Sequence, residues 1–199
     1  MRSAVGIGQR LPAIRNQGPT AMAKKKKSGT GNGWADGVYR AFIDGGIRQV
    51  AYVPDAGHAR LIARCESSPK IRGVPLTTEE EGVAMLAGAW LGGQRGALLM
   101  QSSGAGNCIN MLALIQECRF PLFTLVAMRG EWGEFNPWQV PMGDRTARVL
   151  DNAGVLIKPV DEAGRVAETV TASLRLAFST YRAVAVLISQ RVIGYKAWE

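Results

Sequence analysis

The sequence predicts an open α/β fold, in which about six parallel strands form a sheet that helices cover on both faces. Short apolar runs that suit buried strands alternate along the chain with segments of helical periodicity. The connections between them are short, and glycine or proline marks many of the boundaries. The strand runs are apolar throughout instead of alternating with polar residues, which is typical of parallel strands buried on both faces.

The first half of the expected domain contains three strands and three helices. A helix is expected over 34–44, where large apolar residues recur at helical spacing, and Gly45-Gly46 marks its end. The helix expected over 78–91 is the most regular, because its apolar residues gather on one face. The remaining elements of this half are a helix over 57–65 and strands over 49–53, 72–76 and 96–101.

The second half repeats the same alternation. A glycine turn after the strand at 96–101 leads into a helix expected over 107–117. The run at 121–128 is the most strand-like of the chain, and a segment rich in Gly, Pro and Trp follows it over 129–143. The remaining elements are helices over 144–152 and 161–181 and strands over 155–158 and 183–188.

Residues 1–33 differ in composition from the rest of the chain. They hold few large apolar residues, a run of lysines and the string Ser-Gly-Thr-Gly-Asn-Gly, which predicts a disordered basic tail. Residues 34–199 are expected to form one domain, because this length suits a single hydrophobic core. A transit peptide and a natural translation start at Met22 are alternative explanations of the tail.

The net charge of +8 comes from the start of the chain. Residues 1–35 carry seven Lys and Arg and no acid, which leaves 17 Lys and Arg against 16 Asp and Glu in the remainder. The domain itself is therefore nearly neutral, and this argues against a nucleic-acid groove. No apolar run reaches the roughly 20 residues that a membrane-spanning helix needs.

The cysteines and the histidine limit the chemistry of the chain. Cys65, Cys108 and Cys118 are odd in number and lack the close spacing of metal ligands, so neither a disulfide framework nor a zinc site is expected. Reduced thiols in the cytoplasm are the simpler expectation. His58 is the only histidine, and nothing around it indicates a nucleophilic triad, so we expect a packed or surface residue.

Three consecutive glutamates, residues 79–81, begin the most regular helix. Thr78 as the N-cap and Glu81 three residues later form a capping box, and acidic residues at a helix start interact favourably with the helix dipole. These glutamates therefore need no catalytic purpose when they are considered alone.

A longer pattern gives one of these glutamates a second interpretation. Glu80 is followed by Gly82, by small residues over the next turns, by a glycine-rich turn and a strand, and then by Ser103-Gly104-Ala105-Gly106-Asn107. This pattern resembles the pyrimidine-binding domain of thiamine-diphosphate enzymes. The offsets match without a gap when they are counted from Glu80, so Glu80 is preferred to its two neighbours.

The resemblance is narrower than this large class. The strings beginning at Tyr52, Glu79, Gln101 and Arg129 look like those of sulfopyruvate and phosphonopyruvate decarboxylases, and together the similar segments span most of 34–194. Ala56 stands where a hydroxyl residue is expected, and Ala105 replaces a bulkier apolar residue. Both departures bear on the identity of the substrate.

The resemblance implies specific roles for residues of the chain. Glu80 would be the catalytic carboxylate, because in such enzymes a helix-initial Glu hydrogen-bonds a ring nitrogen of the cofactor's pyrimidine. A carboxyl in an apolar pocket, where its proton affinity can be tuned, suits this role, and Val83, Ala84 and Leu86 are expected to back it. The other cofactor contacts would be Pro54, Gly104 and Gly106, and the substrate contacts would be Asp55, Ser103, Asn107 and Arg129.

The sequence gives further expectations for four of these residues. Asn107 is expected to cap the following helix more readily than to contact substrate. Arg129 is a candidate for holding a second anionic group, because a planar guanidinium suits a sulfonate, phosphonate or carboxylate. Gly104 and Gly106 would let the backbone approach a ligand closely, or would only form a packing turn.

The family anchors the diphosphate and Mg²⁺ through a Gly-Asp-Gly motif on a second domain. This chain offers only Gly143-Asp144-Arg145. The resemblance therefore implies a hetero-oligomer, in which a beta subunit carries the diphosphate site and Mg²⁺, and thiamine diphosphate bridges the interface. No metal ligand is expected on this chain. Trp132, Phe135 and Trp138 are candidates for that interface or for a folded lid.

Two other functions remain open at the level of sequence. A dinucleotide-binding domain would use Ser103-Gly104-Ala105-Gly106 as its phosphate loop, but Ile109 stands at the third glycine position and no acid follows the next strand. A non-catalytic partner subunit that has kept the fold is the second alternative.

Overall fold

The computed structural model describes residues 33–195. The first half of this range runs α1 (Gly33–Asp44), β1 (Ile47–Tyr52), α2 (Ala59–Glu66), β2 (Arg72–Pro75), α3 (Glu79–Leu91) and β3 (Arg95–Gln101). The second half runs α4 (Ser102–Ala105), η1 (Gly106–Cys108), α5 (Leu112–Cys118), β4 (Leu122–Ala127), η2 (Pro137–Gln139), α6 (Val140–Asn152), β5 (Leu156–Val160), η3 (Ala163–Arg165), α7 (Val166–Thr180), β6 (Ala183–Ile188) and α8 (Gln190–Ile193).

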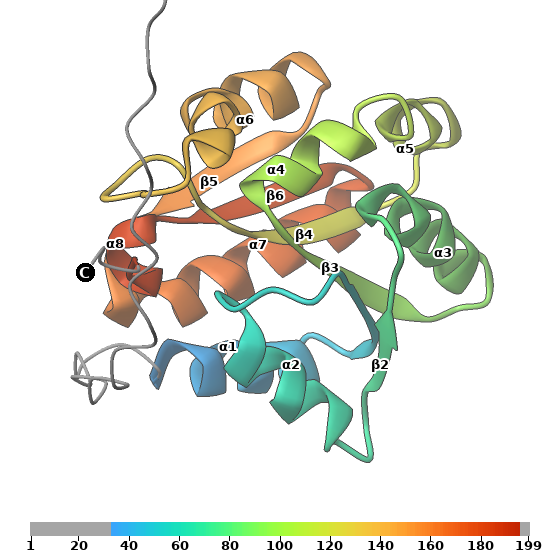
Figure 1. The fold of residues 1–199 in the computed structure, drawn as a ribbon. Coiled ribbons are helices and arrows are strands. Elements are labelled where there is room, and N and C mark those ends of the chain that lie inside the picture. The colour runs from blue at the N-terminus through green and yellow to red at the C-terminus, as the bar shows by residue number, and fades with distance from the viewer. Residues whose placement is uncertain (1–32, 196–199) are drawn as a thin grey trace, which may run out of the picture.

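The six strands form one sheet in the order β2-β1-β3-β4-β6-β5, and every neighbouring pair is parallel (Figure 1). The predicted parallel α/β fold is therefore confirmed. The order runs outward in both directions from β1 and β3, so the winding of the chain reverses between these two strands. In open α/β sheets such a switch point leaves a crevice at the carboxyl ends of the strands, where ligands bind.

The same strand order contradicts the dinucleotide-binding alternative. Dinucleotide-binding domains have the order 3-2-1-4-5-6, whereas this sheet has the order 2-1-3-4-6-5. The glycine string that suggested a phosphate loop is not a loop either, because residues 102–105 form the helical turn α4.

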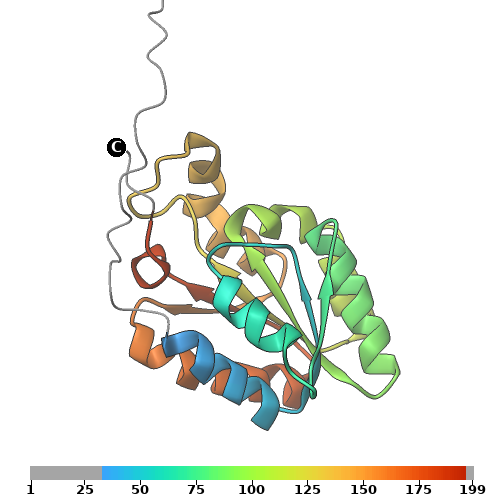
Figure 2. The same cartoon turned by 60° about the horizontal axis from the view of Figure 1, so that its bottom comes forward.

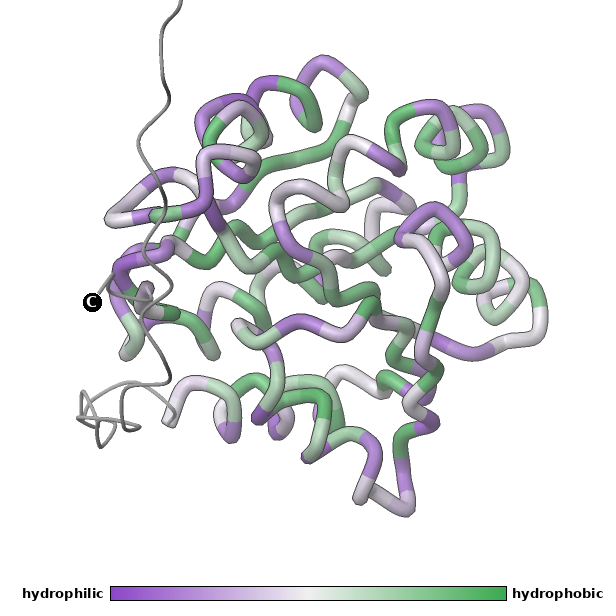
Figure 3. Tube along the Cα trace, viewed as in Figure 1, coloured by the Kyte–Doolittle hydropathy of each residue, from purple (hydrophilic) through white to green (hydrophobic). Residues whose placement is uncertain are grey.

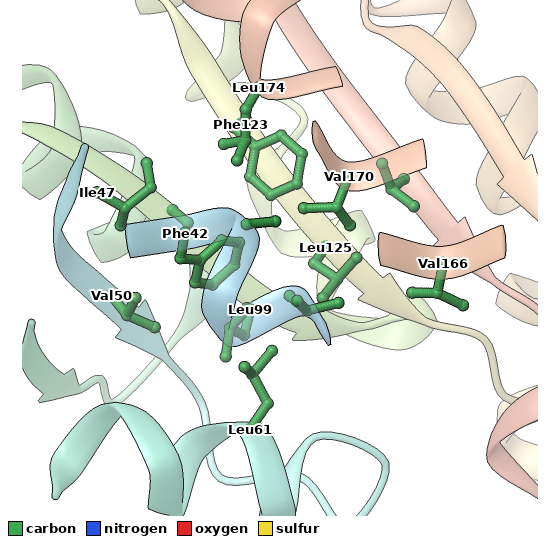
Figure 4. Packing of buried hydrophobic residues seen from close by; sticks show 14 of the residues in the cluster. Phe42, Ile47, Val50, Leu61, Leu99, Phe123, Leu125, Val166, Val170 and Leu174 are labelled. Carbon is green, nitrogen blue, oxygen red and sulfur yellow. The ribbon is translucent and has the colours of Figure 1, made fainter. Parts of the chain in front are cut away.

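Helices cover both faces of the sheet and bury two apolar clusters. Helices α1, α2 and α7 cover one of these clusters (Figure 2), which includes Phe42 and Phe123 (Figure 4). The two rings meet edge to face with 6.0 Å between their centroids. The cluster under α3, α5 and α6 includes Leu98, Met100 and Val126. The central strands β4 and β6 are buried at every position, because each of their residues meets a helix layer on one face or the other, and the middle of the sheet is accordingly mostly hydrophobic in Figure 3.

The predicted strands all occur within a few residues of their expected bounds, and three helices, α1, α2 and α3, do so too. The helix expected over 161–181 ends as predicted, but α7 begins only at Val166, after the short η3. The helix expected over 107–117 is wrong in its start, since the chain turns helical at Ser102 and is interrupted before α5. The helix α6 begins at Val140, inside the segment expected to be irregular, and α8 was not expected. The predicted tail, 1–33, lies outside the described residues apart from Gly33, which begins α1. Among residues 33–195, no helix has the length and apolar character needed to cross a membrane.

Candidate active site

The residues expected at the site follow four neighbouring strands. Asp55 follows β1, Glu80 lies beyond β2 in the first turn of α3, Ser103 follows β3, and Arg129 follows β4. Because parallel strands end at the same edge of a sheet, these residues gather at the carboxyl edge, around the switch point between β1 and β3. The loop after β1 and helix α4 lie at this same edge in Figure 2.

The three glutamates that begin α3 have different environments. Glu79 is 5% exposed, and its Oε2 accepts a hydrogen bond of 2.9 Å from Asn107 Nδ2. Glu80 is half-buried and makes no hydrogen bond or ion pair with another described residue. Glu81 is exposed, and its Oε2 accepts a hydrogen bond from the backbone N–H of Thr77 at 3.0 Å.

This arrangement refines the expected capping box. Thr78 is the N-cap of α3, as predicted, but its hydroxyl makes no capping hydrogen bond. Glu81 does bind the backbone ahead of the helix, one residue earlier than the motif requires. Since Glu81 is used in this way and Glu79 is buried against Asn107, Glu80 is the carboxylate of the three that is available to a ligand.

Glu79 is the buried glutamate of the three, whereas the sequence led us to expect an apolar pocket around Glu80. Val83 and Leu86 are buried, but they lie in the core beneath the helix, and Ala84 is exposed. Within this chain, Glu80 is therefore only half-buried and keeps a side open to water. Another molecule would have to cover that side to remove Glu80 from water.

Gly104 makes room for the Glu79 carboxylate. A Cβ on residue 104 would lie 2.1 Å from Glu79 Oε1 and 2.3 Å from Glu79 Cδ, which no real contact allows. Gly106 has no such constraint, because its nearest neighbour would be Met142 at 3.6 Å, an ordinary contact. The expectation that Asn107 caps a helix is wrong, since Asn107 lies within η1 and its amide binds Glu79.

The Cys108 thiol lies beside these carboxylates and stays protonated. Its burial, together with the charges of Glu79 and Glu80, raises its pKa to about 12. Its Sγ lies 3.6 Å from the Gly104 carbonyl, to which it donates. Cys108 is therefore a packing residue and not a nucleophile.

Ser102 joins the ends of β3 and β4, although the sequence directed attention to Ser103. The Ser102 hydroxyl donates to the Arg129 carbonyl at 2.9 Å and accepts from the Arg129 N–H at 3.0 Å. Thr146 Oγ1 of α6 lies 3.2 Å from the Ser102 carbonyl, within hydrogen-bond range, and 2.6 Å from the Met142 carbonyl of its own helix. One signal could have identified Ser102, namely that it directly follows the strand paired with β4.

Arg129 is held by an acidic partner at the edge of the site. Its Nε and Nη2 donate to the two carboxylate oxygens of Glu134 at 2.7 and 3.1 Å. This pairing holds the pKa of Glu134 at about 2, with help from the Asn136 N–H and Gln190. Two donors of the guanidinium are therefore already used, and an anionic group would have to approach Arg129 from another side.

Helix α8 is hydrogen-bonded to the loop that follows β4, through Gln190. The side-chain oxygen of Gln190 accepts from the N–H groups of Glu131 and Trp132 at 3.2 and 3.0 Å, and its amide donates to Glu134 at 3.0 Å. The Gln190 N–H in turn donates to Glu131 at 2.6 Å. Sequence analysis missed Gln190, because its partners lie more than 50 residues away and no local pattern marks them.

Asp55 and His58 form a buried pair directly after β1. His58 is fully buried, the Asp55 side chain is 4% exposed, and His58 Nδ1 lies 3.6 Å from Asp55 Oδ2. Burial lowers the pKa of His58 to about 4, and the Asp55 charge opposes this shift only in part. His58 is a packed residue, which is one of the two expectations from the sequence, but the buried Asp55 carboxylate beside its ring was not expected.

The residues of this chain suit one part of thiamine diphosphate and not the other. Glu80 offers an available carboxylate that a pyrimidine could bind, and Gly106 nearby is exposed, whereas Gly104 is buried against the Glu79 carboxylate. Gly143-Asp144-Arg145 does not form a diphosphate loop, because it lies inside α6 and Asp144 pairs with Arg148 at 3.1 Å. Gly143 serves packing, since a Cβ there would lie 2.3 Å from the Arg129 carbonyl.

A pocket lies beside this cluster, and Glu80 is not among the residues that line it. Its volume is about 870 Å³, and it opens between the 130–147 segment and the ends of β4, β5 and β6. Its lining includes Glu131, Asp144, Arg145 and Asp161, but neither Glu80 nor Asp55. Glu80 itself is half-buried, so part of this residue remains exposed at the edge, where another molecule can cover it.

The strand order and the polar side chains at the switch point define an open parallel α/β domain, of the class that binds ligands at the carboxyl edge of its sheet. A solved 2-oxoglutarate:ferredoxin oxidoreductase from Magnetococcus marinus has a similar fold, with a TM-score of 0.61 over 82% of this chain and 29% of that chain. The two are 14% identical in sequence. No model of a known protein family matches the chain.

Curated relatives show the family. The sulfopyruvate decarboxylase alpha subunit of Methanothermobacter thermautotrophicus is 34% identical over 77% of this chain and 94% of its own length, and that of Methanococcus maripaludis is 35% identical over 61% and 73%. The phosphonopyruvate decarboxylase of Streptomyces viridochromogenes is 40% identical over 53% of this chain and 27% of its own length. The chain belongs to the family of sulfopyruvate decarboxylase alpha subunits.

Proposed function

We propose that the chain is the pyrimidine-binding alpha subunit of a thiamine-diphosphate-dependent decarboxylase of 2-oxo acids. Its substrate would be sulfopyruvate, phosphonopyruvate or a related anionic 2-oxo acid. The observation that carries the proposal is Glu80, an unpaired carboxylate in the first turn of α3, at the switch point of the sheet, in a family of decarboxylase subunits.

The role of Glu80 follows from its position. When bound, thiamine diphosphate supplies the electron sink for the loss of carbon dioxide. Glu80 would share a proton with a ring nitrogen of the pyrimidine and so set the proton affinity of that ring. Glu79 and Asn107 fix the start of α3 through their hydrogen bond, and this holds Glu80 at the edge of the sheet.

The backbone around Glu80 would complete the pyrimidine site. Gly106 and Pro54 are exposed at the edge of the sheet and would contact the cofactor. Gly104, the third expected contact, is buried against the Glu79 carboxylate, so its contribution would be the room it leaves for that carboxylate. The open side of Glu80 would be closed by the partner subunit, which would bury the shared carboxyl proton in a medium where it is held more strongly.

A beta subunit would supply the diphosphate and Mg²⁺ site that this chain lacks within residues 33–195. The loop between β4 and α6 is suited to contact this subunit, because Trp132 and Trp138 are 45% and 82% exposed. The three cysteines are free thiols, which suits a reducing cytoplasm, the location we propose for the complex.

The substrate would lie between the ends of β1, β3 and β4. Arg129 would attract its sulfonate or phosphonate group, with Glu134 fixing the orientation of the guanidinium. Asp55, Ser103 and Asn107 would complete the substrate contacts, although the Asn107 amide already binds Glu79 in this chain.

Comparison of adjacent glutamates in the assembled complex tests the proposal. The chain is co-expressed with candidate beta subunits, and carbon dioxide release from sulfopyruvate and phosphonopyruvate is measured for wild type, Glu80→Gln and Glu81→Gln. We expect Glu80→Gln to lose activity by a factor on the order of 100 or more, and Glu81→Gln to stay within about threefold of wild type. Equal activity of Glu80→Gln and wild type would remove the proposed role and favour a non-catalytic subunit.

A further inference from the structure

The Asp55–His58 pair contains three buried polar atoms without a hydrogen-bond partner. They are Asp55 Oδ2 and both ring nitrogens of His58. A buried polar atom that gives up water and gains no partner costs on the order of 1–3 kcal/mol. Three such atoms lie next to one another at the carboxyl edge of the sheet, and packing of the core does not account for them. A functional role of this pair would account for them.

The geometry allows the pair to join with a small rotation. Asp55 Oδ2 and His58 Nδ1 are 3.6 Å apart, just beyond hydrogen-bond range, and the Asp55 carbonyl accepts a bond from the His58 N–H at 3.2 Å. Gly57 lies between them, and a Cβ there would stand 2.9 Å from both Asp55 Oδ2 and Ala127 Cβ. Glycine at 57 thus lets the carboxylate fold back toward the ring.

The surroundings of His58 favour a neutral ring. Trp34 of α1 meets the imidazole edge to face at 6.4 Å between centroids, and apolar burial lowers the His58 pKa. Asp55 is the titratable group that acts on His58. Beyond it, Arg129 at the end of β4 interacts with the Asp55 charge, and Glu134 occupies the other side of Arg129.

We propose that His58 is a positioning residue, which donates its Nδ1–H to Asp55 Oδ2 and so holds the Asp55 carboxylate toward the substrate at the carboxyl edge of β1. This proposal rests on the function proposed above, because it assigns a support to one of its substrate contacts. The hydrogen bond uses Oδ2 and leaves Oδ1 to face the substrate. Neutral His58 would donate this hydrogen bond without adding a positive charge beside the substrate.

The nitrogen signals of the histidine test the pair without any measurement of activity. His58 is the only histidine of the chain, so histidine labelled with ¹⁵N in this subunit gives one ring in the spectrum of the complex. We expect the proton on Nδ1 at neutral pH, and a change of the Nδ1 signal in Asp55→Ala. A proton on Nε2 in wild type, or identical signals in wild type and Asp55→Ala, would overturn the proposal.

Two replacements of His58 separate positioning from packing. The His58→Asn replacement keeps a donor at the place of Nδ1, whereas His58→Phe keeps the ring against Trp34 and loses the donor. We expect kcat/KM to fall about tenfold in His58→Phe, as for loss of a hydrogen bond to a charged group, and to recover to within about threefold in His58→Asn. A purely structural role predicts the reverse order, because a ring then matters more than a donor.

The test also distinguishes this proposal from the proposed function. If the wild-type complex decarboxylates none of the 2-oxo acids, the function fails while the nitrogen signals still report on the pair. If the complex is active and the kcat/KM values of both His58 variants equal that of wild type, the positioning role fails while the role of Glu80 stands.

Discussion

Gly104 and Glu79 offer a direct test of how the start of α3 is held. The Gly104→Ala replacement would place a methyl group 2.1 Å from Glu79 Oε1, and also within 2.6 Å of Glu79 Cγ, so the carboxylate must leave its buried position. The hydrogen bond from Asn107 would then break. Elsewhere in a helix, the same replacement is favourable by roughly 0.5–1 kcal/mol, because alanine is a better helix former than glycine.

These two effects have opposite signs, and their sizes decide the outcome. Loss of a hydrogen bond to a charged group costs about 1.5–3 kcal/mol, which exceeds the helix-propensity gain. Gly104→Ala should therefore lower the free energy of unfolding by about 1–2 kcal/mol. In a Glu79→Ala background the obstacle is gone, so the same replacement should raise the free energy of unfolding by roughly 0.5–1 kcal/mol.

Urea unfolding of the four variants in this double-mutant cycle measures the effect. The sign of the Gly104→Ala effect should reverse between the two backgrounds. Gly88→Ala in α3 is a matched control, because a Cβ there meets no atom within 4 Å. If Gly104→Ala destabilises the chain equally with and without the Glu79 carboxylate, the contact between them is not what makes glycine necessary.

Three further results are expected. Between pH 6.5 and 4, His58 takes up a proton in the unfolded chain but stays neutral in the folded chain, because burial lowers its pKa to about 4. The free energy of unfolding should therefore fall by about 3 kcal/mol as the pH drops through this window. Urea unfolding at several pH values measures this dependence, and His58→Phe should remove it. Arg129→Met should raise the KM for sulfopyruvate at least tenfold with a smaller change in kcat, and an unchanged KM would exclude this guanidinium from the substrate site. In the native chain a thiol reagent should modify exposed Cys118 within minutes. Cys108 should react only after unfolding, because it is buried and its pKa of about 12 keeps it protonated. Peptide mass measures which cysteine is modified, and rapid modification of Cys108 in the native protein would contradict its burial.

The strands could be predicted because their signal is local. Each central strand is a short apolar run between turn residues, and the runs at 121–128 and 183–188 match β4 and β6 closely. The order of the strands could be predicted only as a class, since adjacency in the sheet depends on packing between distant segments. The helix start at Ser102 was missed because its two glycines suggested a turn, whereas contact with α6 through Thr146 stabilises helical backbone there.

The glutamate string shows a different limit. Successive residues of a helix point about 100° apart, so the spacing pattern could select Glu80 by comparison but could not show which neighbour is buried. The burial of Glu79 depends on Gly104 and Asn107, which lie more than 20 residues later. The Asp55–His58 pair was missed because a lone histidine carries no pattern, and only the fold brings its ring into an apolar layer with Trp34.

Binding of thiamine diphosphate tests the central claim, that this chain is one half of a shared site. Calorimetric titration compares the chain alone, the complex with its beta subunit, and the complex carrying Glu80→Gln, each with Mg²⁺ present. We expect no measurable binding to the chain alone, tight binding to the wild-type complex, and binding weakened at least tenfold by Glu80→Gln, as for loss of a hydrogen bond to a charged group. Tight binding to the isolated chain, or equal affinity of the wild-type and Glu80→Gln complexes, would contradict the account.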